Sequence, residues 1–422
     1  MAIEDIIRAS EIYKNAFRRL VFAQHDEGLS RKNSNISSSV TLEIAALAKK
    51  MKAEGEDVIS FSAGEPDFKT PKNIRDEAIR VIEEGLTGYT AASGIIELKK
   101  AIVNKFSKDN HLSYKPENII VSCGAKHSLF NALQAICNPG DEVIIPLPYW
   151  VSYPDLVKMA DATPVCVALK PENGFAYNNE DLEAVVTDKT RAIIINSPNN
   201  PTGAVYDEAT LKMIYNFAKK HELIIISDEI YEELVYDGKH ISIASLSEDA
   251  KERTIVVNGM SKGYAMTGWR IGYAAAATKF VKVMANFQSH STSNPNTIAQ
   301  YASVEALTGP QDEVKRFRTA FDERRKYMVE RLKEIQHIHS FEPSGAFYVM
   351  VDVKAFYGKT WEGEVINNSS DFCRCLLQAK KVASIPGLAF GVDDYVRFSY
   401  AISIERIEEG LNRFEHFLNS LK

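Results

Sequence analysis

The chain has 422 residues, of which 45% are hydrophobic and 25% charged, a composition typical of a globular protein with more than one folding unit. Its formal charge is −6, from 50 basic and 56 acidic residues, and no basic stretch is interleaved with aromatic residues, so nucleic acid is not expected as a partner. The apolar runs are only as long as strands, well short of the roughly 20 residues of a membrane-spanning helix, so no membrane partner is expected either.

The first 28 residues form a separate predicted segment. Their apolar residues recur at helical spacing, but they lack the uninterrupted apolar stretch and the cleavage site of a secretory signal. We therefore expect residues 1–28 to be an N-terminal extension with a docking helix, and we expect the protein in the cytoplasm. The five cysteines agree with this, because they are odd in number and scattered, as is typical of reduced thiols that bind no metal.

The rest of the chain divides into three predicted parts. Residues 29–70 are expected to form coil, a helix around Thr41–Ala53 and a short strand, and to pack with the C-terminal part. From 71 to 314, apolar runs alternate with amphipathic helical stretches, which predicts a large α/β domain with a mostly parallel sheet between helices. Residues 315–422 are expected to form a smaller α+β domain, because a long charged helix precedes two alternating strands.

The most unusual polar segments of the large domain lie directly after its predicted strands. They are SCGAKH (122–127), PYWV (148–151), NSPNNPTG (196–203), SDEIY (227–231) and NGMSK (258–262). In an open parallel sheet, ligands bind in the crevice at the carboxyl ends of the strands. We therefore expect these five segments to converge on one site.

One part of this site has the features of an anion-binding turn. Gly124, Ala125 and Lys126 open a predicted helix directly after a strand, where small residues let backbone N–H groups and the helix dipole approach a phosphate. Arg270 adds a permanent cation with a donor fork that suits phosphate. An ordinary tight turn and an arginine at the edge of the core are the alternatives.

Asp228 and Lys262 are the candidates for chemistry. A carboxylate at the end of a buried strand needs a protonated or hydrogen-bonding partner, and Tyr231 follows it by one helical turn. The small and apolar neighbours of Lys262 would lower the pKa of its amine and favour the neutral form that makes a Schiff base. Neutralisation of Asp228 by a lysine or arginine, and a plain surface position for Lys262, are the alternatives.

Seven motifs in order give the chain a specific resemblance. They are SAGEPDF (62–68), GYTAASGI (88–95), PYWVSYP (148–154), NSPNNPTG (196–203), SDEIY (227–231), SKGYAMTGWRIGY (261–273) and VRFSYA (396–401). With them the chain resembles the class I aminotransferases, which are fold-type I pyridoxal-phosphate enzymes, from about Leu29 to the C-terminus. The resemblance implies a large domain with a mostly parallel seven-stranded sheet between helices, a smaller α+β domain, and a homodimer with active sites at the subunit interface.

The resemblance also implies residue roles around pyridoxal 5′-phosphate. Lys262 would hold the cofactor as a Schiff base and then move a proton at the substrate, and Asp228 would keep the ring nitrogen protonated. Asn200 and Tyr231 would contact the phenolic oxygen, and Trp150 would stack on the ring. The phosphate would be held by Gly124, Ala125, Lys126, Ser261 and Arg270, and by Tyr89 from the second subunit.

Substrate residues follow from the same resemblance. Arg397 would bind the α-carboxylate with the Gly64 backbone nearby, and Asn200 and Trp150 would also contact the substrate. The chain is most similar to the bacterial-type aspartate aminotransferases, in which residues matching Lys126, Ser39 and Thr41 meet the distal carboxylate. This implies ping-pong transfer of an amino group from aspartate, or a related acidic amino acid, to 2-oxoglutarate.

Several alternatives stay open on the sequence. The chain departs from its relatives at Gly259, where many have a hydroxyl residue near the phosphate, and at Ala125, which replaces a common glycine. Ser37 stands where members that act on prephenate have lysine. A broad-specificity, aromatic or prephenate aminotransferase is therefore the main alternative, ahead of a pyridoxal-phosphate lyase or a non-enzymatic regulator built on the same domain.

Overall fold

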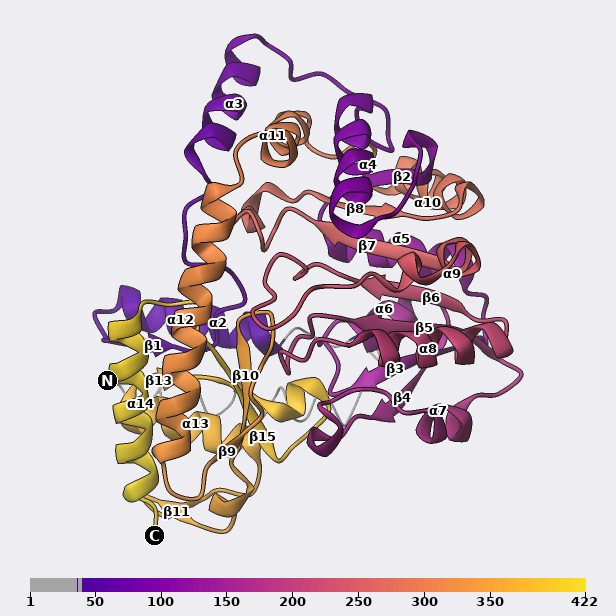
Figure 1. The fold of residues 1–422 in the computed structure, drawn as a ribbon. Helices are drawn as coiled ribbons and strands as arrows, with labels where there is room; N and C mark the ends of the chain where they lie inside the picture. The colour runs from indigo at the N-terminus through magenta and orange to yellow at the C-terminus, as the bar shows by residue number, and fades with distance from the viewer. Residues whose placement is uncertain (1–35, 37–39) are drawn as a thin grey trace, which may run out of the picture.

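In the computed structural model, which describes Ile36 and residues 40–422, a seven-stranded sheet carries most of the large domain (Figure 1). Its strands lie in the order β2-β8-β7-β6-β5-β3-β4. All neighbours are parallel except β8, which runs antiparallel to β2 and β7. The strands are β2 (Ile119–Ser122), β3 (Glu142–Leu147), β4 (Thr163–Ala168), β5 (Thr190–Asn196), β6 (Ile224–Asp228), β7 (Thr254–Gly259) and β8 (Gly272–Ala275). The predicted mostly parallel sheet is thus confirmed.

Helices cover both faces of this sheet because alternate residues of the central strands are apolar on both sides. Ile194 of β5 faces one core, whereas Ile193 and Ile195 face the other. One face packs against α5 (Ala125–Ile136), α6 (Tyr153–Met159) and α10 (Thr278–Ser291). The other packs against α4 (Ile96–Asn110), α8 (Glu208–Lys220) and α11 (Thr297–Thr308). Shorter or peripheral helices are α3 (Lys72–Glu83), α7 (Asn179–Val185) and α9 (Glu248–Arg253).

A second, antiparallel sheet with strand order β14-β15-β10-β9 has its own core. Its strands are β9 (His339–Ser340), β10 (Tyr348–Asp352), β14 (Ile385–Pro386) and β15 (Tyr395–Ser399). The long helix α12 (Asp312–Glu334) leads to it from the large sheet, and α13 (Ser369–Lys380) and α14 (Ile404–Asn419) complete this unit (Figure 1). A small hairpin joins β11 (Thr360–Trp361) to β12 (Glu364–Val365).

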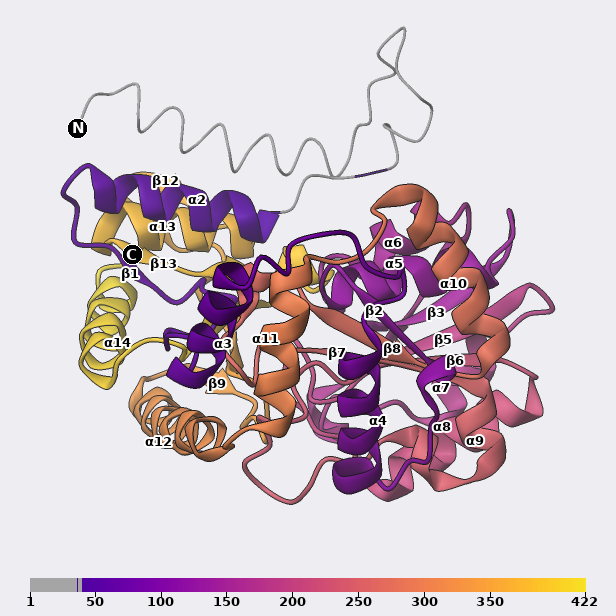
Figure 2. The same cartoon turned by 90° about the horizontal axis from the view of Figure 1, so that it is seen from above.

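The described N-terminal residues pack on this second unit. Strand β1 (Ile59–Ser60) pairs in parallel with β13 (Val382–Ala383). Helix α2 (Val40–Ala53) lies beside α13 (Figure 2), and its Ala48 joins a small core with Leu377. The predicted extension 1–28 and the candidates Ser37 and Ser39 lie outside the described residues. Within residues 40–422, no helix combines the length and the hydropathy of a membrane span.

The start of α5 is pressed directly onto the sheet. A Cβ atom on Gly272 of β8 would lie 2.1 Å from the backbone nitrogen of Ala125 and 2.3 Å from the carbonyl carbon of Gly124. Because both neighbours are backbone atoms, they cannot rotate away as a side chain would. The absence of a side chain at Gly272 therefore sets how closely the predicted anion-binding turn approaches β8.

We expect Gly272→Ala to lower the melting temperature by roughly 1–4 °C, because overpacking of a filled core typically costs about 1–3 kcal/mol. Calorimetry of the purified variant measures this. Gly268→Ala is the matched control, because the added Cβ meets no atom within 4 Å. Equal melting temperatures for the two variants would show that the close approach is not a constraint.

Candidate active site

A cavity of about 730 Å³ lies where the carboxyl ends of the central strands meet the second sheet. Its size is within the range of about 300–1,000 Å³ of small-molecule sites. The structure brings most of the sequence-predicted residues together at its wall: Thr41, Gly64, Ala125, Lys126, Trp150, Asn200, Asp228, Tyr231, Ser261, Lys262, Arg270 and Arg397. Segments more than 300 residues apart in the chain, those of Gly64 and Arg397, thus form one site.

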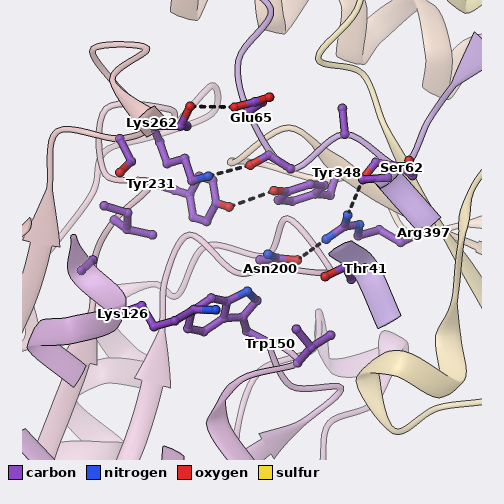
Figure 3. Close-up of a pocket in the computed structure, with 18 of the residues that line it drawn as sticks. Thr41, Ser62, Glu65, Lys126, Trp150, Asn200, Tyr231, Lys262, Tyr348 and Arg397 are labelled. Atoms are coloured by element: carbon purple, nitrogen blue, oxygen red, sulfur yellow. Dashed lines mark hydrogen bonds between the residues drawn. The ribbon is translucent and has the colours of Figure 1, made fainter. Parts of the chain in front are cut away.

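Lys262 points its amine into this cavity (Figure 3). Its Nζ donates a hydrogen bond of 2.6 Å to the carbonyl oxygen of Gly64 and lies 5.9 Å from the ring centre of Tyr231. Burial lowers the pKa of the Lys262 amine to about 8, against a smaller raising effect of Glu65. At pH 7 about a tenth of the amine is therefore neutral and nucleophilic, far more than for an ordinary lysine with a pKa of about 10.4.

Asp228 is a buried carboxylate at the end of β6, with 4% of its surface exposed. Its Oδ2 accepts a hydrogen bond of 2.7 Å from the Tyr153 hydroxyl, and its Oδ1 accepts from the backbone N–H of Ile230 at 3.3 Å. Burial raises the pKa of Asp228 to about 6, and the Tyr153 hydrogen bond opposes this. No described lysine or arginine forms an ion pair with it, so the carboxylate suits a protonated group of a ligand.

Arg397 is a buried cation at the opposite wall of the cavity. Its Nη1 donates to Oδ1 of Asn200 at 2.9 Å, and its Nη2 donates to the carbonyl oxygen of Ser62 at 3.3 Å (Figure 3). The Nε is buried without a hydrogen-bond partner, and no described carboxylate pairs with this guanidinium. A buried arginine that keeps its charge without a counterion is suited to an anionic ligand.

A second pair of cations lies near the start of α5. Nζ of Lys126 lies 4.9 Å from the ring centre of Trp150 (Figure 3), and burial, with the charge of Arg270, lowers the pKa of Lys126. Arg270 donates to the carbonyl oxygens of Thr267 and Cys123 at 2.9 and 3.3 Å. Two like charges at one helix N-terminus favour a bound anion.

Gly124 makes room for this arrangement. The residue has φ of 89°, and a Cβ atom there would lie 2.2 Å from Nη2 of Arg270. The glycine lets the arginine lie directly over the turn 124–126, so the predicted phosphate-binding turn and Arg270 are adjacent. At Gly259, the position where many members of the resembled family have a hydroxyl residue, an added Cβ atom would lie 2.9 Å from the Cα of Gly272, so a side chain would be crowded there.

The turn that carries Asp228 and Tyr231 is held from behind by buried charges. Glu229 accepts hydrogen bonds from Ser227, Ser242 and His240 at 2.8, 2.7 and 3.0 Å, and Glu232 pairs with Lys105. Glu229, Glu232 and His240 place possible metal ligands within 4.8 Å of one another. The Lys105 ammonium already supplies a cation to Glu232, so this cluster serves as a structural ion network.

Two tyrosines of the site were not singled out from the sequence. Tyr153 holds Asp228, and Tyr348 of β10 lies 2.9 Å from Tyr231, hydroxyl to hydroxyl (Figure 3). In the sequence both are aromatic residues within apolar segments, which is the ordinary pattern of a core residue. Tyr89 does not line the cavity of this chain, and 96% of its surface is exposed.

Comparison with known proteins gives one family. A family model described as aminotransferase class I and II matches residues 56–414. The chain is 48% identical to an aspartate aminotransferase of Bacillus sp. (strain YM-2), over 93% of this chain and 99% of that one. It is 47% identical to a probable aspartate/prephenate aminotransferase of Aquifex aeolicus, over 94% and 100%. Its structure is similar, with a TM-score of 0.88, 41% identity and coverage of 93% and 100%, to the aspartate aminotransferase from Thermus thermophilus with maleate.

In the protein without a bound ligand, the acylation rate of the Lys262 amine by acetic anhydride is expected to rise with pH and reach half its maximum near pH 8. Below that pH the amine is protonated and inert, because burial lowers its pKa only to about 8, whereas an ordinary lysine titrates at about 10.4. Isotope labelling followed by mass spectrometry of the peptide that contains Lys262 measures the midpoint. A midpoint near that of the bulk lysines would contradict the pKa shift.

Proposed function

Because the chain belongs to the aminotransferase class I and II family, we propose that it is an enzyme that transfers the amino group of aspartate to 2-oxoglutarate with bound pyridoxal 5′-phosphate. One observation carries the proposal. A lysine of lowered pKa, a buried carboxylate and a buried arginine face one cavity, and neither Asp228 nor Arg397 has an ion-pair partner among the described residues.

The residues present fit the cofactor. Its phosphate matches the cations Arg270 and Lys126 at the start of α5, and its protonated ring nitrogen matches the carboxylate of Asp228. Tyr231 and Asn200 supply polar groups for the phenolic oxygen, and Trp150 supplies a flat apolar face for the ring. Ser261, Gly124 and Ala125 complete the phosphate contacts in this proposal. When bound, the cofactor supplies an aldehyde for amines and a ring that withdraws electrons from the substrate Cα.

The protein's own part of the reaction is binding and proton transfer. Lys262 would hold the aldehyde of the cofactor and, once released by the substrate amine, would take the proton from the substrate Cα. Its lowered pKa keeps a neutral fraction available for this step. The hydrogen bond from Tyr153 holds Asp228 in its charged form despite burial, which keeps the ring nitrogen protonated. A second substrate, the keto acid, then receives the amino group in the reverse sequence.

Two cationic positions support a dicarboxylate substrate. Arg397 is assigned to the α-carboxylate, together with Asn200 and the backbone at Gly64. Lys126, beside Trp150, is assigned to the distal carboxylate, with Thr41 of α2 and with Ser39, which lies outside the described residues. The similar Thermus thermophilus enzyme is an aspartate aminotransferase with maleate, which is a dicarboxylate. Prephenate, named for the Aquifex aeolicus relative, also has two carboxylates and is the second candidate.

A homodimer completes the proposal. Tyr89 is almost fully exposed on the loop before α4, which suits a residue that reaches the phosphate site of a second copy. The proposed domains are 71–314 for cofactor binding and 315–422 for the smaller unit, with residues 29–70 packed on the latter. Localisation in the cytoplasm stays a prediction.

The purified protein loaded with pyridoxal phosphate is expected to show an absorbance band near the violet end of the visible spectrum. This band should disappear when aspartate is added and return when 2-oxoglutarate is added. The reason is that the band reports the cofactor bound to Lys262, which the amino donor displaces. Stopped-flow absorbance measures both half-reactions, and Lys262→Ala, which removes the amine, is the control. Ammonia release without a need for a keto acid would instead identify a lyase, and prephenate in place of 2-oxoglutarate tests the second candidate.

Lys126→Met is expected to lower kcat/KM for aspartate roughly 10- to 100-fold, because a charged hydrogen bond to the distal carboxylate is worth about 1.5–3 kcal/mol. Alanine, which lacks that carboxylate, is the internal control, and its kcat/KM should change much less. Steady-state rates with both donors give the ratio. An equal loss for alanine and aspartate would place Lys126 at the phosphate alone.

A further inference from the structure

Two buried tyrosine hydroxyls meet between the two halves of the cavity. Tyr231 comes from the turn after β6 of the large sheet, and Tyr348 comes from β10 of the second sheet. Their hydroxyl oxygens lie 2.9 Å apart, and the side chains are 3% and 1% exposed. In Figure 3 the Tyr348 ring lies between Tyr231 and Arg397. The pair therefore connects the residue assigned to the phenolic oxygen with the residue assigned to the α-carboxylate.

A hydrogen bond between two hydroxyls has a direction, and the surroundings of this pair favour one. The guanidinium carbon of Arg397 lies 4.2 Å from the ring centre of Tyr348. A cation over the ring stabilises the phenolate and makes Tyr348 the stronger acid of the two. Arg397 is the main influence that opposes the rise in the pKa of Tyr348 that burial causes. Arg397 also acts on Tyr231, but burial and Tyr348 together still raise the pKa of Tyr231 well above its usual value.

The stronger acid is the better donor, so the Tyr348 hydroxyl donates and the Tyr231 oxygen accepts. A tyrosine hydroxyl has one proton and two lone pairs. When Tyr231 accepts from Tyr348, its own proton is left for a third group. That group is within the cavity, because Tyr231 lines the cavity wall and no other side-chain partner of its hydroxyl is found among the described residues.

We propose that Tyr348 is a positioning residue whose hydroxyl donates to Tyr231 and so directs the Tyr231 proton at the phenolic oxygen of the bound cofactor. The inference rests on the proposed function, because it requires that cofactor. The proposal gives the ring and the hydroxyl of Tyr348 two different roles. The ring of Tyr348 supports Arg397, and the hydroxyl of Tyr348 orients Tyr231.

The hydroxyl has a spectroscopic consequence. The absorbance of the bound cofactor would depend on whether the nitrogen that joins it to Lys262 carries a proton. Without this proton, the negative charge of the phenolic oxygen has no neighbouring positive charge. A hydrogen-bond donor at that oxygen stabilises the deprotonated form and lowers the pKa of the absorbance change. Removal of the Tyr348 hydroxyl weakens the donor, so the pKa should rise.

The test is a pH titration of the cofactor absorbance in Tyr348→Phe, with Tyr400→Phe as the matched control. We expect the pKa of the absorbance change to rise by about half a unit in Tyr348→Phe, which corresponds to a roughly threefold smaller acid dissociation constant. Tyr400 is also a fully buried tyrosine of the second unit, and its hydroxyl donates to the carbonyl oxygen of Ala346 at 3.3 Å. It does not line the cavity, so Tyr400→Phe should titrate as the unchanged protein does.

A binding measurement separates the ring from the hydroxyl. Tyr348→Phe keeps the ring under Arg397, so the dissociation constant of maleate should stay within about twofold. Tyr348→Leu removes the ring, and maleate should bind roughly fivefold more weakly, which corresponds to the loss of a cation–π contact of about 1 kcal/mol. Fluorescence or absorbance titration of the loaded protein gives both constants, and melting temperatures show that each variant is folded.

The outcomes separate this inference from the proposed function. If the unchanged protein shows no cofactor absorbance band that changes with pH, the proposed function is wrong. A normal titration in the unchanged protein with no shift in Tyr348→Phe would overturn the role of Tyr348 alone. An equal shift in Tyr400→Phe would also overturn it, because any buried hydroxyl of the second unit would then have the same effect.

Discussion

Unpaired charge around one cavity is the constraint on which the site depends. Asp228, Arg397 and Lys126 are each withdrawn from bulk water to some degree, and none forms an ion pair with a described residue. Such groups are costly to bury, because desolvation penalises a charge that has no counterion. The folded protein keeps the charges apart and leaves their neutralisation to ligands. A site of this kind binds a molecule that carries the complementary charges at matching positions, which is what a phosphorylated pyridinium and a dicarboxylate provide.

The contrast with the ion network behind the cavity supports this view. Glu229 and Glu232 belong to the same turn as Asp228 and Tyr231, yet their carboxylates point the other way and are fully partnered by serines, His240 and Lys105. Adjacent residues of one turn thus have opposite environments, because Asp228 and Tyr231 line the cavity and Glu229 and Glu232 do not. The paired carboxylates hold the turn in place, and the unpaired one faces the cavity, so rigidity and binding capacity come from neighbouring residues of the same type.

The sequence predicted the parts of this structure that have a local signature. Strands such as Thr190–Asn196 and Ile224–Asp228 contain a run of consecutive buried isoleucines, because both faces of the sheet are covered. Asp228 ends one of these strands, and Lys262 lies three residues after the end of β7. The edge strand Thr163–Ala168 lacks this signature, since it contains Pro164 and is partly exposed, as edge strands tolerate. The reversed direction of β8 has no local signature either, because an apolar strand looks the same in both orientations.

The contacts that the sequence could not predict are those between the two units. Tyr231 and Tyr348 are 117 residues apart and Asn200 and Arg397 are 197 apart, and nothing near either residue of a pair indicates its partner. These two hydrogen bonds cross from the large sheet, which carries Lys262 and Asp228, to the second sheet, which carries Arg397. Each of the two sheets holds part of the chemistry, and each crossing bond ends on a residue assigned to the cofactor. Occupation of the carboxylate site on one sheet is therefore linked, through single hydrogen bonds, to the groups that surround the reacting atoms on the other.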